Sequence, residues 1–496
     1  MNRNFSRRII LSVVLFFQLI SLPAQVKNEL LDDRDAWFWD FKDAGKFFRP
    51  QFIGNKSYII YKDYEGLLET NGTASGTRVL TSTGGKGEIF DVVATEKFLY
   101  MLTRSKSTDG KLYHYRLFRI DPVTDQTIQA TDPASGKTVQ FNREIEGGDM
   151  SYRLSAYKNR VIFVFFLEAG ILPFKSLSVL HDEDPLPAVH YLVYETDMKL
   201  SGENLWKRIA VTNDKVYYYD SANYKVQIKE FRKTNGNNER PYYYDFAGFD
   251  FAKNGIRILS LFDNTNGEAF MLGAYEKGTD KGRHFVLQFK DRKAAVLAKF
   301  ESNLDEVVVN NGTIYLFGYR RVVELKMDGT LQPVLSLQGE NGLTPIGENR
   351  KMLLFQGARM FYGISADLGS MLRTEYWCHD LVANKDYKIA KVDMESMYTD
   401  KVRERKWLHV AGDYFYFLEP KQAYYMLKRK NFITGAPEEE AVITGFDGTS
   451  ASGNVGDIHQ SGQVIFFWGN FTYKKKVKKK TKEFKNRVIG AVSLQG

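Results

Sequence analysis

The chain of 496 residues contains a single cysteine, Cys378, and only 12 prolines. One cysteine cannot form an internal disulfide, so stability must come from burial of a hydrophobic core. A chain of this length buries ample apolar surface for that purpose. The scarcity of proline also means that no Pro/Ser-rich linker divides the sequence, which favours one continuous domain over two.

Long apolar runs are scarce as well. After the first 24 residues the longest unbroken run covers residues 161–167, which fits a buried strand and is too short to span a membrane. Within residues 1–24, three arginines precede an apolar segment (9–19) and Ala24, the order found in a secretory signal peptide. No cysteine directly follows this segment, so lipoprotein attachment at the new N-terminus is not available. We therefore expect an exported protein, periplasmic or secreted, without a transmembrane span in the mature chain.

The motifs of common catalytic sites are absent from the sequence. There is no Gly-rich phosphate loop, no His-Glu-x-x-His zinc helix and no Gly-x-Ser-x-Gly nucleophile elbow. The acidic loop 181–184 (His-Asp-Glu-Asp) offers oxygen ligands but lacks the ligand spacing of an EF-hand, so an ordinary turn is favoured over a Ca²⁺ site. No metal and no cofactor are expected, and an enzyme becomes the less favoured class.

Short stretches with period-two alternation of apolar and polar residues dominate the chain. Aromatic residues make up 14% of it, with 29 Tyr and 36 Phe, and these favour strands over helices. Strand-like runs separated by turn residues recur along the whole length, and helical periodicity is nearly absent after residue 24. The pattern predicts an all-β protein.

The predicted strands recur in groups of about 40 to 55 residues, which is the spacing of four-stranded propeller blades. Nine strand-rich intervals can be marked between residues 50 and 496. Because nine blades are more than one propeller ring normally holds, some of these intervals must belong to the same blade. We predict a single β-propeller of seven or eight four-stranded antiparallel blades over residues 50–496, with two smaller propellers in tandem as the alternative. Residues 25–49 can close the ring by pairing in the blade that ends with the strand-like run at 488–492.

One part of the chain resembles a known blade repeat. Residues 67–80 resemble the E-L-W-x-T-D-G-T-x-x-G-T-x-x-V repeat of secreted bacterial β-propeller proteins, many of them from Bacteroidota. Asn71-Gly72-Thr73 and Gly76-Thr77 carry the match, with Asn in place of the usual Asp and with Leu or Glu in place of the usual Trp. Residues 328–330 (Asp-Gly-Thr) keep only the first half of the motif. The resemblance implies a propeller fold in an exported bacterial protein, and it implies no activity because such repeats are structural.

Charge is distributed very unevenly along the sequence. The formal net charge is +9, and the three N-terminal arginines contribute +3 of it. Residues 474–487 hold eight Lys, one Arg and one Glu and contribute +8, which leaves the rest of the chain at −2. This distribution excludes a basic surface spread over the fold, so no nucleic-acid partner is expected. Since strand-like runs flank the basic segment, we expect a hairpin insertion at 473–487.

The density of lysine suggests that this hairpin binds an anionic surface, such as lipid headgroups, lipopolysaccharide phosphates or acidic polysaccharide. The candidate binding residues are Lys474, Lys475, Lys476, Lys478, Lys479, Lys480 and Lys482. A self-repelling loop that only improves solubility explains the same composition equally well. The favoured hypothesis is a binding or scaffolding module at the bacterial cell envelope, whose partner is a protein or an acidic glycan.

The alternative hypothesis is a propeller polysaccharide lyase or glycoside hydrolase that acts on an acidic glycan. A lyase needs His or Tyr to transfer protons and Arg or Lys to neutralise a uronate carboxylate. The candidate residues for these roles are His114, Arg116, His190 and Tyr191, provided that their two blades converge on the mouth of the ring. Ordinary surface residues on strands are the simpler interpretation of all four.

Overall fold

The computed structural model describes most of the chain between residues 25 and 495. Within the described residues every regular element is a β-strand. None of them forms a helix that is long and apolar enough to cross a membrane. The expected signal peptide, residues 1–24, lies outside the described ranges, which are 25–32, 51–61, 66–82, 87–144, 150–167, 174–194, 209–212, 215–220, 225–230, 242–243, 249, 255–264, 266–290, 293–301, 304–318, 321–336, 354–367, 371–395, 409–421, 424–461, 464–478 and 480–495.

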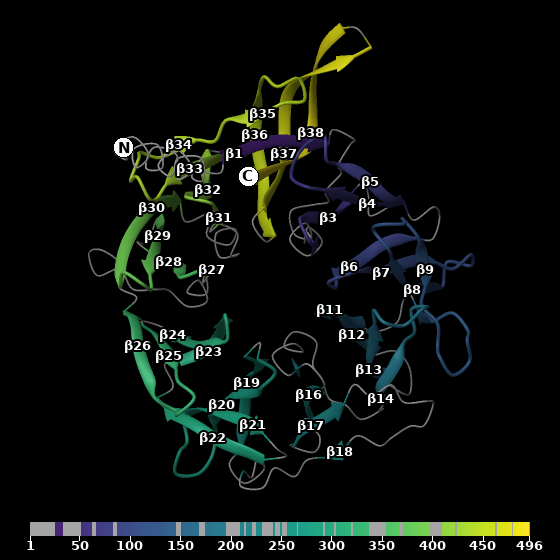
Figure 1. Cartoon of the computed structure of the whole chain (residues 1–496), viewed down its shortest axis with the longest axis vertical. Coiled ribbons are helices and arrows are strands. Elements are labelled where there is room, and N and C mark those ends of the chain that lie inside the picture. Colours follow the sequence, from purple (N-terminus) through teal and green to yellow (C-terminus); the bar gives the residue numbers. More distant parts are fainter. Residues whose placement is uncertain are drawn as a thin grey trace, which may run out of the picture.

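Eight sheets follow one another around a ring in the described part of the chain (Figure 1). Six of them have four strands and one has five, all paired antiparallel. The all-β propeller predicted from the alternation is therefore confirmed. The first four sheets are β2 (Gln51–Ile53), β3 (Lys56–Tyr61), β4 (Gly66–Thr70), β5 (Arg78–Ser82); β6 (Glu88–Ala94), β7 (Leu99–Lys106), β8 (Leu112–Ile120), β9 (Thr127–Gln129), β10 (Gln140–Glu144); β11 (Met150–Tyr157), β12 (Arg160–Leu167), β13 (Phe174–His181), β14 (His190–Tyr194); and β15 (Ile209–Val211), β16 (Lys215–Asp220), β17 (Lys225–Glu230), β18 (Tyr242–Tyr243).

The next three sheets repeat this four-stranded plan. They are β19 (Ile256–Asp263), β20 (Ala269–Tyr275), β21 (His284–Lys290), β22 (Lys293–Phe300); β23 (Leu304–Asn310), β24 (Thr313–Gly318), β25 (Arg321–Leu325), β26 (Leu331–Ser336); and β27 (Leu354–Gln356), β28 (Arg359–Asp367), β29 (Met371–Asp380), β30 (Lys385–Glu395). Within each of them the strands pair in chain order.

The eighth sheet is larger and contains the last two of the nine intervals marked in the sequence. Its nine strands form two groups, β31–β34 and β35–β38 with β1, which are joined by one pairing between β33 and β36 (Tyr425↔Val455). The expected merging of intervals therefore takes place at the end of the chain. The strands are β31 (His409–Ala411), β32 (Tyr414–Lys421), β33 (Tyr424–Asn431), β34 (Glu439–Glu440), β35 (Ile443–Thr444), β36 (Ser450–Ser461), β37 (Val464–Val477), β38 (Lys480–Gln495) and β1 (Gln25–Asp32).

The first strands of successive sheets contact one another, as β2 contacts β6, β6 contacts β11 and β15 contacts β19. The first strands therefore border the axis of the ring, and the fourth strands, such as β14 and β30, lie at its circumference (Figure 1). This order decides which side chains can reach the mouth of the ring.

Hydrophobic core fills the spaces between neighbouring sheets. Tyr58 and Leu67 of the first sheet, for example, pack with Ile89 and Leu99 of the second. Inner strands are consequently buried on both faces, and all seven residues of β20 are buried. Two-sided burial explains why several strands read in the sequence as continuous apolar runs instead of strict alternation.

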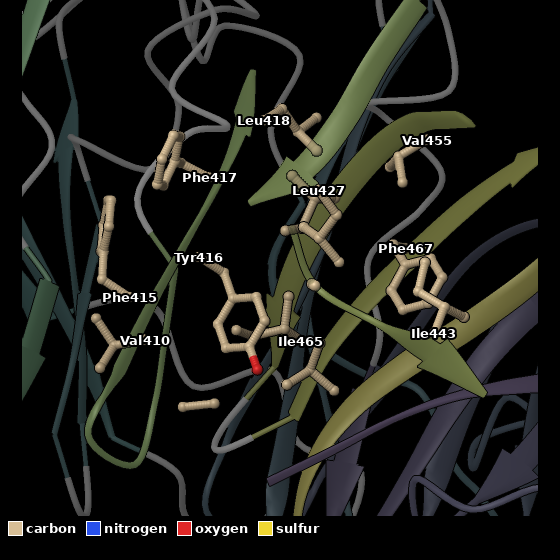
Figure 2. Close-up of a cluster of buried hydrophobic side chains, with 14 of the residues drawn as sticks. Val410, Phe415, Tyr416, Phe417, Leu418, Leu427, Ile443, Val455, Ile465 and Phe467 are labelled. Atoms are coloured by element: carbon tan, nitrogen blue, oxygen red, sulfur yellow. The ribbon is translucent and has the colours of Figure 1, made fainter. Parts of the chain in front are cut away.

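The two ends of the chain meet in the eighth sheet. β1 pairs antiparallel with β38, from Gln25↔Gln495 to Asp32↔Ile489. Leu30 of β1 is 1% exposed and belongs to a core cluster of the eighth sheet. Part of this cluster is shown in Figure 2, where Tyr416 of β32 lies beside Ile465 of β37.

The other face of β37 and β38 packs against the first sheet. Phe466, Trp468 and Ile489 contact a cluster that includes Ile59 and Leu68. This contact joins the last sheet to the first and completes the ring.

Candidate functional site

The lysine-rich segment forms the outer half of a long hairpin. β37 and β38 pair in register as far as Val477↔Lys480. β36 accompanies β37 only to Thr472, and β1 accompanies β38 only to Ile489. Residues 473–487, called the basic arm below, therefore continue as a two-stranded ribbon. The yellow hairpin in Figure 1 extends beyond the ring at this point.

Aromatic side chains hold the base of the arm. Tyr473 is 1% exposed and stacks on Phe484 with ring centroids 5.8 Å apart. Phe446 meets the Tyr473 ring edge-on at 5.0 Å, and the Nζ of Lys475 lies 5.3 Å from the centre of the Phe446 ring. Because these rings pack on the core, the arm begins at a fixed point of the eighth sheet.

The lysines are divided between the two faces of the arm. Residues paired directly across a ribbon share a face, and successive residues alternate between faces. The pairings Lys475↔Lys482 and Val477↔Lys480 define one face, and Lys476↔Thr481 and Thr472↔Lys485 define the other. The first face, called the Lys482 face, carries Lys475, Lys480 and Lys482, and the second, called the Lys476 face, carries Lys474, Lys476 and Lys485.

The arm has little acidic charge to balance these lysines. Three lysines of the arm, Lys476, Lys480 and Lys482, are exposed. Glu483 is the one acidic residue between positions 474 and 487. Lys478, in the turn, is also exposed, whereas Lys479 lies outside the described residues. The arm is thus a strongly positive projection from a ring that is close to neutral.

His114 and Arg116, two of the candidate catalytic residues, lie on β8, the third strand of the second sheet. His114 Nδ1 is 2.7 Å from Asn142 Oδ1, and Arg116 Nε donates to Gln140 Oε1 at 2.9 Å. Both partners are on the adjacent strand β10. These contacts tie both side chains to their own sheet.

His190 and Tyr191 begin β14 at the circumference of the third sheet. His190 Nε2 is 2.9 Å from Asp184 Oδ2, and the Tyr191 side chain is exposed. Neither this pair nor the pair on β8 lies on a first strand, so the structure does not bring the four residues together at the axis. Their catalytic role stays a prediction.

The acidic loop considered as a Ca²⁺ site joins the second and third sheets. Tyr100 donates its hydroxyl hydrogen to Asp182 Oδ1 at 2.9 Å, and Arg119 donates to the carbonyl oxygens of Asp184 at 2.6 Å and Pro185 at 2.8 Å. Burial raises the pKa of Asp182. Among the residues that the structure describes, no group of three or more His, Cys, Asp or Glu is arranged to hold a metal ion. The loop therefore serves as a tie between sheets.

A second tie, between the first and second sheets, was missed in the sequence. Arg78 donates two hydrogen bonds to Asp125, at 2.8 and 3.0 Å, and a third to Glu69 at 2.9 Å. Burial by itself raises the pKa of Glu69, but hydrogen bonds from Arg78 and Lys56 outweigh it and lower the pKa. The signal in the sequence that could have indicated this tie is the acidic Glu69 at the end of an otherwise apolar strand.

Cys378 is buried, and burial raises the pKa of its thiol to about 12. The side chain is therefore a neutral thiol at physiological pH, which suits a packing role and not that of a nucleophile.

Comparison with known proteins shows resemblance to several solved structures at low identity. The chain matches no protein-family profile and no curated protein. It resembles a putative dipeptidyl aminopeptidase IV from Bacteroides ovatus, with 8% identity and a TM-score of 0.36, over 90% of this chain and 66% of that one. It also resembles the WD40 domain of SCAP from fission yeast, with 7% identity and a TM-score of 0.40 over 95% of each chain. A further resemblance is to TolB from Acinetobacter baumannii, with 10% identity and a TM-score of 0.23 over 82% of this chain and 80% of that one. The chain thus spans just under two thirds of the aminopeptidase, and at such scores the resemblances carry no argument about activity.

Proposed function

We propose that this protein is an exported binding or scaffolding module at the bacterial cell envelope, and that the basic arm is the surface through which it holds an anionic partner. The ring supplies a rigid support, because its sheets are packed face to face and joined by buried charged residues. The arm supplies the attraction. The leader-like residues 1–24 support export.

The observation that carries the proposal is the separation of charge. Residues 474–487 contribute +8, whereas the rest of the chain after the leader is slightly acidic. A loop that served only solubility would gain as much from lysines scattered over the ring, since solubility depends on net charge. Gathering them on one projecting ribbon concentrates the positive potential where a partner can approach.

The decisive experiment shortens the arm and keeps the stacked pair of Tyr473 and Phe484 at its base. Replacing residues 475–482 with Asn-Gly leaves Lys474 opposite Glu483 as the last pair and closes the ribbon with a favoured two-residue turn. The change removes six lysines. Near an anionic surface each lysine contributes about 1 kcal/mol, so we expect adsorption to acidic polysaccharide or anionic vesicles to fall at least about a hundredfold at low salt.

A full-length variant with glutamine at the same six lysines is the matched control, because it keeps the length of the ribbon. It should lose adsorption to the same extent as the shortened arm. Adding salt should abolish the difference from wild type, since screening weakens exposed charges. Unchanged adsorption of the shortened protein at low salt would refute the proposal.

A further inference from the structure

We infer that the anionic partner of the basic arm is a linear acidic polysaccharide that contacts both faces of the ribbon at once. This inference rests on the proposed function and specifies the class of ligand for the same site. It follows from the distribution of charge on the arm, the absence of side chains suited to a bilayer, and the repulsion built into the ribbon.

Positive charge on the arm points in two opposite directions. The Lys482 face and the Lys476 face each carry three described lysines, and the Lys476 face also carries Glu483, directly opposite Lys474. A flat surface can touch only one of these faces, and the ammonium groups of the other then lie roughly 10 Å farther away. At physiological salt the Debye length is about 8 Å, so those groups would contribute little. A flexible chain can follow one face and turn round the tip to the other.

The arm also lacks the apolar side chains that membrane-binding segments insert between lipids. Val477 is the one apolar residue between positions 474 and 483. The aromatic residues nearby, Tyr473 and Phe484, stack on each other at the base and pack against the core. Interfacial segments usually combine basic residues with exposed Trp, Phe or Leu. The described arm offers charge alone, which suits a fully hydrated polyanion.

Repulsion within the arm favours a partner that surrounds it. Lys475 and Lys482 are directly opposite each other, an arrangement that destabilises a ribbon. Two-stranded ribbons are marginally stable in water even without such a pair. Carboxylates placed against the Lys482 face relieve this repulsion, and carboxylates placed against the Lys476 face balance its lysines, so the bound arm gains stability.

The type of basic residue fits the same ligand. Between positions 474 and 487 there are eight lysines and one arginine. Arginine suits fixed bidentate contacts with a single phosphate or carboxylate, whereas lysine is a flexible point charge. A run of lysines therefore matches carboxylates whose spacing varies along a flexible polymer.

The test uses two double variants matched in charge and exposure. Lys476→Gln with Lys485→Gln neutralises part of the Lys476 face, and Lys480→Gln with Lys482→Gln neutralises part of the Lys482 face. All four lysines are exposed. Affinity for polygalacturonate is measured by titration calorimetry over a range of salt concentrations, and adsorption is measured on vesicles of phosphatidylcholine and phosphatidylglycerol. A double change of Lys277 and Lys281 to Gln, on the exposed β20–β21 turn, is the control.

We expect each arm variant to weaken polygalacturonate binding by a similar factor, roughly tenfold at low salt. Each should also reduce the slope of log affinity against log salt concentration by about one to two in magnitude. The control should bind like the wild type.

The outcomes separate this inference from the proposed function. If only one face matters, or if vesicles bind more tightly than polygalacturonate, the inference is overturned while the arm remains a binding site. If the shortened arm binds both probes as well as wild type does, the proposed function fails too. Circular dichroism confirms that each variant retains its strands.

Discussion

At the scale of single residues, some of the buried polar side chains in this protein take part in contacts between neighbouring sheets, as Asp182 does with Tyr100. Asp182 is 7% exposed and accepts a hydrogen bond from Tyr100 of the second sheet. Glu69 is 3% exposed and accepts one from Arg78 of its own sheet, which also donates to Asp125 of the second sheet. Such groups are costly to bury unless they are paired. Their pairing with Tyr100 and Arg78 offsets that cost and holds the sheets in a fixed relation.

His181, the residue before Asp182, is a buried side chain whose protonation depends on pH. Burial lowers its pKa to about 4, and Arg160 Nε donates a hydrogen bond to its Nδ1 at 3.3 Å. The neutral imidazole is therefore the form that the folded protein accommodates. The unfolded chain binds a proton on His181 at a pH near 6.5, which is higher than in the folded state.

We expect the contribution of neutral His181 to the free energy of unfolding to be fully present above about pH 6.5 and to decline as the pH falls towards about 4. The contribution of His181 is at most about 3 kcal/mol. Urea unfolding of the wild type and of His181→Asn at several pH values measures this contribution. The free energy of unfolding of the variant should fall less steeply with decreasing pH than that of the wild type. Coinciding slopes for wild type and His181→Asn would show that this histidine does not couple stability to pH.

At the scale of elements, turns of two kinds recur between the strands. In the first kind, Asx-Gly-Thr, the side-chain oxygen accepts a hydrogen bond from the backbone of the residue two positions on, and the glycine has positive φ. The copies at 71–73 and 328–330 are the ones recognised in the sequence. The copy at 447–449 was overlooked, although its Asp-Gly-Thr is explicit.

The second kind of turn begins with Asp121, Asp380 or Asn431. In each case the side-chain oxygen accepts hydrogen bonds from the backbone two and three residues later. The fifth residue has positive φ, at Asp125, Asn384 and Gly435. These side chains replace backbone partners and so define where one strand ends and the next begins.

Removing one such side chain should destabilise its turn. Asn431→Ala loses bonds of 3.0 Å from Ile433 N and 2.9 Å from Thr434 N. We expect the free energy of unfolding, measured in urea, to fall by about 1 kcal/mol. Ile433→Ala, at an exposed position of the same turn, should stay within about 0.5 kcal/mol of wild type. Equal unfolding midpoints for the two variants would argue against a stabilising role of the Asn431 side chain.

At the scale of the whole molecule, the N-terminal strand completes the last sheet. The pairings of β36, β37, β38, β1 and β35 form a closed circle, with β35 meeting β1 at Glu29↔Thr444 and β36 at Ile443↔Ala451. A closed circle leaves fewer exposed edges for unwanted pairing. The two ends of the sequence are thereby made dependent on each other.

Loss of β1 should therefore weaken the ring. Leu30→Ala removes a fully buried side chain and should lower the free energy of unfolding by about 3 kcal/mol. A protein that begins at residue 33 should melt at a lower temperature and aggregate, because the edge of β38 becomes available. A peptide of residues 25–32 should restore the melting temperature by strand addition, and the same peptide with Leu30→Asp should not. A truncated protein as stable as wild type would contradict a closing role for β1.

The all-β class, the propeller and the position of the basic arm were predictable from the sequence, because alternation, turn residues and charge runs are local properties. The sharing of one sheet by the last two strand groups depends on pairings such as Tyr425↔Val455, which join residues 30 positions apart. The tie at Asp182 needs Tyr100 from another sheet, and nothing near Asp182 in the sequence identifies that partner. The division of the lysines between two faces depends on the register of β37 with β38, since a shift by one residue would redistribute every side chain. Local sequence thus determined which elements form, and long-range packing and register decided which residues meet.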